Sequence, residues 1–208
     1  GAYSKTWRSV HRMSIGRVYI VRHGNTFDKG DTILRVGGRT DLYLSSSGLA
    51  QAKRLKMELV AIKFNTAYSS NLNRTRQTAE VILGQQPYEI AEFLKEIDYG
   101  PDEGRPESDV VMRLGTEAMK QWDVNAIPPP GWQVDIQDIR TAWQAFLASC
   151  PRNTNTLVVT SNGVARFLLD VVDGGISAPR KLRTGSYGIV ELRATGPALT
   201  GWDIRPIA

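Results

Sequence analysis

Three short apolar runs, each followed by a segment with helical periodicity, constrain the fold of this chain more than any other feature. The runs lie at residues 18–21, 64–70 and 157–160. Runs of this length that are rich in β-branched and aromatic residues are typical of buried strands. Because strand and helix alternate, a largely parallel sheet is favoured. The sequence therefore predicts an α/β fold with a mainly parallel sheet.

The helix after residue 44 has the clearest signal. A run of serines at 45–47 provides a cap, and apolar residues then recur at three-to-four spacing, at Leu49, Ala52, Leu55, Leu59 and Ile62. This pattern predicts an amphipathic helix packed on the sheet. Further helices are predicted over about 71–83 and from Gly163, and further strands at 189–192 and 199–204.

Residues 92–138 differ in composition from the rest of the chain, with eleven acidic against four basic side chains and a proline-rich break at 128–131. We interpret the segment as a helical insertion over the active face. It contains one predicted helix around 110–122 and another that begins near Ile136. Trp122 and Trp132 are predicted to be packing residues.

The length of 208 residues fits one domain. Residues 1–16 are predicted to be a basic tail and residues 17–208 a single domain. The whole net charge of +5 lies in residues 1–22, and the remaining chain is balanced. Because the body has no basic helix, we expect no nucleic-acid partner. No apolar run approaches the roughly 18 residues that cross a bilayer, so we expect no membrane partner.

The cysteine content points to a reducing compartment. Cys150 is the single cysteine, so no internal disulfide can form, and one Cys with two His residues provides too few ligands for a structural zinc site. The first dozen residues also lack the apolar core of a signal peptide. We therefore expect a cytoplasmic protein with no metal and no cofactor. The sequence leaves open whether it forms a homodimer.

Two segments carry the chemistry. Arg22, His23 and Gly24 follow the first predicted strand directly, and Arg74 lies where a helix begins after the second strand. Helix N-termini carry unpaired N–H groups, and a guanidinium fork matches phosphate oxygens, so the two segments together predict a phosphate pocket. A histidine beside such a pocket is a candidate nucleophile.

These motifs resemble the histidine phosphatase superfamily, also called the phosphoglycerate-mutase-like family. Five blocks occur in the family's order: Arg-His-Gly at 22–24, Gly38-x-x-Asp41-x-x-Leu44 with Gly48-x-x-Gln51-Ala52, Ser-Ser-x-Leu-x-Arg-x-x-Gln-Thr-Ala at 69–79, the acid-bearing segment at 94–104, and the segment at 158–167. The resemblance covers about residues 17–193.

The resemblance implies a three-layer α/β fold and a reaction through a phosphohistidine on His23. It also implies that Arg22 and Arg74 hold the phosphoryl oxygens and that Glu96 protonates the leaving group. Fixed cations suit a phosphoryl group whose charge spreads over three oxygens. A positioned acid accelerates departure of a poor leaving group by about 10²–10⁴-fold. Asp98, Asp102 and Glu103 are rival acids in the same segment.

The chain departs from the family pattern at several positions. Asn162 stands where the family has its second catalytic histidine, and either donates to phosphate or caps a helix. Asn25 and Lys29 replace an acid and an asparagine of many members, which makes the pocket more positive. Gly37 stands where a glutamine is usual. Asn25, Thr26, Lys29 and Asn162 join the two arginines as predicted substrate-binding residues, although Thr26 could instead donate to the backbone.

The sequence thus predicts a metal-independent phosphatase that hydrolyses a small phosphorylated metabolite and binds phosphate or sulfate in its pocket. The alternatives are a phosphoglycerate-mutase-type phosphotransferase and a degenerate member that binds a phosphorylated ligand or a protein without turnover. The Asn25-Thr26 pair and Arg39 disfavour a mutase, whose sequences usually have Glu-Ser and Trp there. Asn162 keeps the degenerate alternative open.

Overall fold

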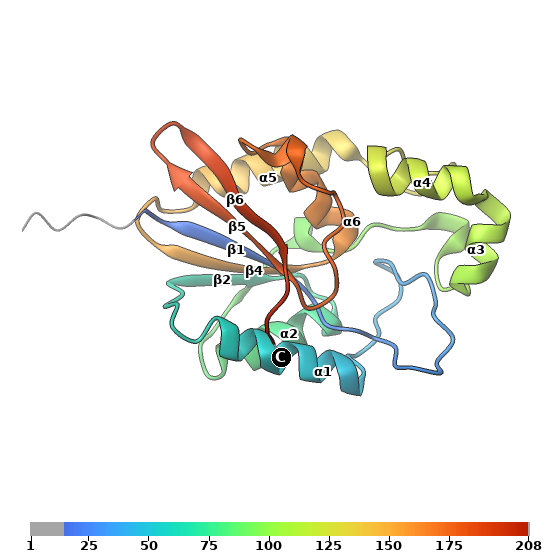
Figure 1. The fold of residues 1–208 in the computed structure, drawn as a ribbon, viewed down its shortest axis with the longest axis horizontal. Coiled ribbons are helices and arrows are strands. Elements are labelled where there is room, and N and C mark those ends of the chain that lie inside the picture. Colours follow the sequence, from blue (N-terminus) through green and yellow to red (C-terminus); the bar gives the residue numbers. More distant parts are fainter. Residues whose placement is uncertain (1–14, 208) are drawn as a thin grey trace, which may run out of the picture.

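A six-stranded sheet runs through the part of the chain that the computed structural model describes, residues 15–207 (Figure 1). The strand order is β3-β2-β4-β1-β5-β6, in which β3, β2, β4 and β1 are parallel while β5 and β6 are antiparallel to their neighbours. The sheet is therefore mixed and mostly parallel, as predicted. The strands are β1 (Arg17–Arg22), β2 (Thr66–Ser69), β3 (Glu89–Ile90), β4 (Asn155–Thr160), β5 (Tyr187–Arg193) and β6 (Gly196–Ile204).

The strand β1 lies in the interior of the sheet, between β4 and β5. Its side chains alternate between two apolar cores: Val18 and Ile20 pack on one face, and Tyr19 and Val21 on the other. Successive side chains of a strand point to opposite faces, so a strand covered on both faces is apolar at every position. This is why residues 18–21 form an unbroken apolar run.

Helices cover both faces of the sheet, so the predicted three layers are present (Figure 1). The helices α1 and α2 contribute Leu55 and Ala79 to the core that contains Val21, and α5 contributes the fully buried Trp143 to the opposite core. The helices are α1 (Ser46–Glu58), α2 (Asn73–Leu83), α3 (Glu107–Leu114), α4 (Thr116–Asn125), α5 (Ile136–Ser149) and α6 (Asn162–Ala165), with 3₁₀ turns at Glu92–Leu94, Gly100–Asp102, Arg166–Asp170 and Gly175–Ser177.

The helix α1 begins at the predicted cap, where the Ser45 hydroxyl accepts a hydrogen bond from the Gly48 N–H at 3.2 Å. Its first turn lies against the loop after β1, because the Ser45 N–H donates to the Asn25 carbonyl at 2.9 Å. Leu49 in this turn, which was predicted to pack on the sheet, is 37% exposed. The serine cap therefore connects α1 to the segment that follows His23.

The insertion differs from its prediction in one respect. The prediction of one helix around 110–122 is wrong, because the chain forms two helices there, α3 and α4. Gly115, at a φ of 88°, separates them. An α-helix cannot continue through a positive φ, which glycine adopts readily. The helix α5 begins at Ile136 as predicted, and Trp122 and Trp132 are buried packing residues. The helices α3 and α4 lie beyond the carboxyl ends of the parallel strands (Figure 1).

The strands at the two edges of the sheet differ from the sequence prediction. The short strand β3 was not predicted, and β5 and β6 are longer than the predicted runs. The predicted basic tail lies outside the described residues except for Ile15 and Gly16. Within residues 15–207, the helices are too short or too polar to cross a membrane.

Candidate active site

A cavity of about 580 Å³ opens at the carboxyl ends of the parallel strands. It is lined by residues from the carboxyl ends of β1 and β4, from the first turn of α2 and from the segment after β3. In an open parallel sheet these ends meet at one edge. The eight predicted site residues all line this cavity: Arg22, His23, Asn25, Thr26, Lys29, Arg74, Glu96 and Asn162.

His23 is buried at the end of β1, with 6% of its surface exposed. Its Nδ1 lies 2.7 Å from the Gly24 carbonyl oxygen. Because a carbonyl oxygen only accepts, Nδ1 carries the proton and Nε2 keeps its lone pair. Burial lowers the pKa of the imidazole well below its ordinary value, and the charges of Arg74 and Arg22 lower it further. The ring is therefore neutral at pH 7, with a free nitrogen available as a nucleophile.

Arg22 reaches the cavity from the last position of β1. Its guanidinium donates through one terminal nitrogen to the Leu182 carbonyl at 2.9 Å. Its Nε is buried and lacks a hydrogen-bond partner within the described structure. Burial lowers the pKa of this group, as expected for a cation removed from water.

Arg74 lies in the first turn of α2 and is 1% exposed. Its two terminal nitrogens donate to the carbonyl oxygens of Thr40 at 2.7 Å and Gly37 at 3.1 Å. Burial is also the main cause that lowers its pKa. Among residues 15–207, neither Arg74 nor Arg22 forms an ion pair with a carboxylate. The strongest opposing influence on both groups is the charge of Glu96, which raises the pKa of each against the effect of burial.

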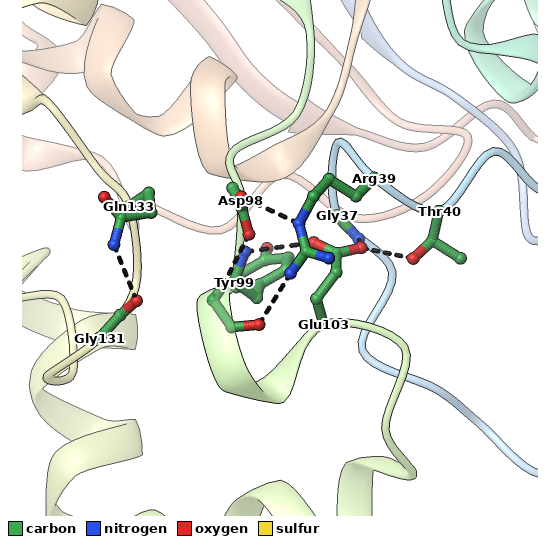
Figure 2. A network of polar contacts seen from close by, with 9 residues as sticks. Gly37, Arg39, Thr40, Asp98, Tyr99, Glu103, Gly131 and Gln133 are labelled. Carbon is green, nitrogen blue, oxygen red and sulfur yellow. Dashed lines mark hydrogen bonds and ion pairs between the residues drawn. The ribbon is translucent and has the colours of Figure 1, made fainter.

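The two carbonyls that hold Arg74 belong to a loop that is fixed by a polar network (Figure 2). The Glu103 carboxylate accepts from the Gly37 N–H at 2.9 Å and from the Thr40 hydroxyl. Arg39 donates to Asp98 and to the Gly100 carbonyl, each at 2.9 Å.

This network also explains the unusual glycine at position 37. A Cβ atom there would lie 2.0 Å from Glu103 Oε1 and 2.6 Å from the Ile97 carbonyl oxygen. The space that a glutamine side chain would need is therefore filled by Glu103.

Glu96 lies after the 3₁₀ turn at Glu92–Leu94, which is attached to the end of β4 because the Thr160 hydroxyl donates to the Leu94 carbonyl at 2.7 Å. Its carboxylate is 7% exposed and accepts from the Ile97 N–H at 3.0 Å and the Gly163 N–H at 3.3 Å. The Tyr99 hydroxyl is 3.4 Å away. Burial, and then the Glu96 charge, raise the pKa of Tyr99, so its hydroxyl keeps the proton that it donates.

The structure separates Glu96 from its three rivals, which do not line the cavity. Asp98 pairs with Arg39, and Glu103 holds the loop around Gly37. Asp102 is fully buried, pairs with Arg113 and accepts from the Trp132 indole at 2.8 Å. Each rival is therefore engaged in structural contacts.

Asn162 is the first residue of α6 and borders the cavity. The interpretation of this residue as a helix cap is wrong: Ser161 is the N-cap, and the Asn162 side-chain oxygen accepts from the Leu182 N–H at 2.9 Å. The short helix begins one residue earlier than a capping role for Asn162 requires. Because the oxygen is engaged, the amide nitrogen is the part of the side chain that remains as a donor.

The other predicted binding residues differ in how strongly they are fixed. The Asn25 amide donates to Ser47 at 3.2 Å and accepts from the Thr184 hydroxyl at 2.6 Å, so both of its ends are engaged by the protein. Thr26 is partly buried at the cavity wall, and Lys29 is exposed at its mouth.

The sequence analysis missed the loop at 181–186. This loop provides the Leu182 carbonyl for Arg22 and the Leu182 N–H for Asn162, and the Gly185 N–H donates to the Arg22 carbonyl at 3.1 Å. It precedes β5, whose antiparallel pairing with β1 brings the loop to the end of β1. No local motif signals this, because the pairing direction depends on the whole sheet.

The same loop is attached to the end of β6. Asp203 accepts from the Arg183 backbone N–H at 2.9 Å and from its Nε at 2.7 Å, and its carbonyl accepts from the guanidinium at 3.3 Å. Asp203 has a φ of 54°, which is uncommon for a residue other than glycine. Strain of this kind persists where surrounding contacts hold it. Asp203 therefore fixes the loop that contacts Arg22.

Residues 15–207 contain no group of three or more His, Cys, Asp or Glu side chains that could hold a metal ion. The positive charge at the base of the cavity comes from Arg22 and Arg74.

Comparison with known proteins finds relatives over much of the chain. A fructose-2,6-bisphosphatase TIGAR B from Danio rerio is 32% identical over 136 residues, which cover 62% of this chain and 51% of that relative, so the chain spans about half of its length. A 2,3-bisphosphoglycerate-dependent phosphoglycerate mutase from Bradyrhizobium diazoefficiens is 28% identical over 208 residues, covering 92% of this chain and 99% of that one.

Solved structures share the fold. The alpha-ribazole phosphatase from Shigella flexneri superimposes with a TM-score of 0.71 at 24% identity, over 92% of this chain and 98% of that chain. The family model of the histidine phosphatase superfamily, branch 1, matches residues 18–205, which include the whole cavity. The chain therefore belongs to branch 1 of the histidine phosphatase superfamily.

Proposed function

We propose that this protein is a metal-independent phosphatase that hydrolyses a small phosphate monoester through a phosphohistidine intermediate on His23. The state of His23 carries the proposal. Its proton lies on Nδ1, its pKa is strongly lowered, and it lines a cavity together with the guanidinium groups of Arg22 and Arg74, which form no ion pair among the described residues. A neutral nucleophile beside fixed cations is the arrangement that phosphoryl transfer to nitrogen requires.

The reaction has two steps. Nε2 of His23 attacks phosphorus, the bond from phosphorus to the ester oxygen breaks, and Glu96 gives its proton to the departing alkoxide. A water molecule then attacks the phosphohistidine and loses a proton to Glu96, which releases inorganic phosphate and restores the imidazole. Arg22 and Arg74 stabilise the charge on the phosphoryl oxygens in both steps.

Asn162 takes the position of the family's second histidine in this proposal. Its amide nitrogen donates to the phosphoryl group, while its oxygen holds Leu182. An amide lacks the charge of an imidazolium, and a charged hydrogen bond is worth about 1–2 kcal/mol more than a neutral one. We therefore propose an enzyme with reduced turnover. Thr26 and Lys29 complete the proposed substrate-binding set, and Asn25, whose amide is engaged by Ser47 and Thr184, supports it from the cavity wall.

The first prediction concerns His23. His23→Ala abolishes hydrolysis of p-nitrophenyl phosphate, whereas His11→Ala, which changes the other histidine of the chain, leaves it intact. Rapid quenching of the wild type under alkaline conditions, followed by mass spectrometry, detects an acid-labile phosphate on the peptide that contains His23. EDTA does not reduce the rate. A phosphopeptide that persists in His23→Ala would refute the intermediate.

The second prediction concerns Glu96. Glu96→Gln lowers kcat for an alkyl phosphate by about 10²-fold or more, but lowers kcat for p-nitrophenyl phosphate much less, because nitrophenolate leaves without a proton donor. Glu92→Gln, which changes an exposed acid outside the cavity, affects neither substrate. Equal losses on both substrates in Glu96→Gln would contradict its role as the acid.

The third prediction separates two roles of Asn162. Asn162→Asp keeps the oxygen that accepts from Leu182 but replaces the amide donor with a negative charge, whereas Asn162→Ala removes both. If the amide donates to phosphate, Asn162→Asp lowers kcat/KM about tenfold more than Asn162→Ala and weakens inhibition by inorganic phosphate.

The matched control for this prediction is Asn65→Asp. Asn65 also uses its side-chain oxygen as an acceptor, from the Asn155 N–H at 3.0 Å, and it does not line the cavity. Its substitution leaves kcat/KM unchanged. Higher activity in Asn162→Asp than in Asn162→Ala would limit Asn162 to holding Leu182.

The fourth prediction concerns the contact between Asp203 and Arg183. Asp203→Gly keeps the positive φ without steric cost but frees the 181–186 loop, so kcat/KM for p-nitrophenyl phosphate falls about tenfold while the Tm changes little. Asp203→Asn retains most activity, since asparagine tolerates this backbone and its oxygen still accepts from Arg183. The control is Arg193→Ala, which removes an exposed ion pair with Glu191 on the same hairpin. Full activity in Asp203→Gly would show that the contact does not position Arg22.

A further inference from the structure

The helix α2 carries Arg74 in its first turn but has no cap of its own. The residue before the helix is Leu72, whose side chain cannot accept a hydrogen bond. The first N–H groups of an α-helix have no partner within the helix, so a polar side chain at the cap position usually satisfies one of them. The start of α2 therefore depends on a partner from another part of the chain.

Asp41 is this partner. One of its carboxylate oxygens accepts from the Asn73 backbone N–H at 2.7 Å, and the other accepts from the Asn73 side-chain amide at 3.0 Å. A carboxylate is favoured at this end of a helix because the helix dipole is positive there. Asp41 belongs to the motif Gly38-x-x-Asp41-x-x-Leu44, and it does not line the cavity.

The loop at 37–44 contacts α2 at two further points. Arg74 donates to two of its carbonyls, and, one turn further along α2, the Gln77 side-chain oxygen accepts from the Leu44 N–H at 2.7 Å. Positions four apart lie on the same face of a helix, so Asn73 and Gln77 attach the loop to α2 on either side of Arg74. These contacts fix the backbone of Arg74 relative to the loop.

We propose that Asp41 is a positioning residue for Arg74: by capping α2 from the loop, it places the guanidinium where it can contact a phosphoryl group in the cavity. This inference rests on the proposed function, in which Arg74 binds phosphate. Because Arg74 lines the cavity and Asp41 does not, Asp41 acts on phosphate through Arg74 and not by direct contact.

The position of Arg74 and the charge of Asp41 lead to opposite expectations. Burial lowers the pKa of Arg74, and the Asp41 charge is one of those that oppose this effect. If only this charge mattered, its removal would tighten the binding of an anion, because a repulsive charge is lost. If Asp41 positions Arg74, the loss of its hydrogen bonds weakens the binding. The sign of the change therefore separates the two.

The test measures the binding of inorganic phosphate to the full chain by calorimetry. Asp41→Ala should weaken it about tenfold, the scale of one hydrogen bond to a charged group. Asp41→Asn should bind phosphate at least as tightly as the wild type. Its oxygen still accepts from the Asn73 N–H, the Asn73 amide can turn to present its own oxygen, and the negative charge is gone. A weakened alanine variant beside an unimpaired asparagine variant is the signature of positioning.

The matched control is Asp135→Ala. Asp135 is also an exposed helix cap, because its carboxylate accepts from the Asp138 N–H at 3.0 Å at the start of α5, and it does not line the cavity. Asp41 is equally an exposed residue, so its substitution removes no core packing. Both alanine variants lose a cap, so their Tm values should fall by similar amounts, but only Asp41→Ala should lose phosphate affinity.

Three results overturn the inference: unchanged or tighter phosphate binding in Asp41→Ala, an equal loss in Asp135→Ala, or binding in Asp41→Asn as weak as in Asp41→Ala. Hydrolysis of p-nitrophenyl phosphate is measured separately and reports on the proposed function. A protein that hydrolyses no phosphate ester, but whose phosphate binding depends on Asp41 in this way, would refute the phosphatase and support the positioning role.

Discussion

Two guanidinium groups that are held by backbone carbonyls, and not by ion pairs with carboxylates, are the constraint on which the rest of this structure depends. Removing a charge from water costs several kcal/mol when no partner compensates it. Carbonyls of Leu182, Gly37 and Thr40 accept from terminal nitrogens of Arg22 and Arg74, while the Nε atoms of both lack a hydrogen-bond partner within the described structure. In the function that we propose, a phosphoryl dianion compensates these two charges.

Each carbonyl is held in place by contacts from another part of the chain. Glu103 fixes the loop that contains Gly37 and Thr40, and Asp203 fixes the loop that contains Leu182. The charges of Arg74 and Arg22 add to burial in lowering the pKa of His23, so the groups that we propose to hold phosphate also keep the imidazole neutral. The insertion contributes Glu96 to the lining of the cavity, together with Met119 and Trp122 from α4.

The cavity holds opposite charges close together. Arg22 and Arg74 line it, and Glu96, whose charge raises the pKa of both guanidinium groups against the effect of burial, lines it as well. The lining also includes apolar side chains from the loop after β1 and from α4. Relatives of the chain are named as phosphatases and as phosphoglycerate mutases, and hydrolysis is the reaction that we propose.

The sequence by itself determined the strand and helix alternation, the parallel order of its three predicted strands, and the placement of Arg22, His23 and Arg74 at the edge of the sheet, because strand ends and helix starts are local signals. Tertiary structure decided what depends on distant partners. The choice of Glu96 over Asp98, Asp102 and Glu103, the role of the 181–186 loop, and the break at Gly115 were of this kind. The contact between Asn162 and Leu182 also exists only because β5 pairs antiparallel with β1, a direction that no local pattern specifies.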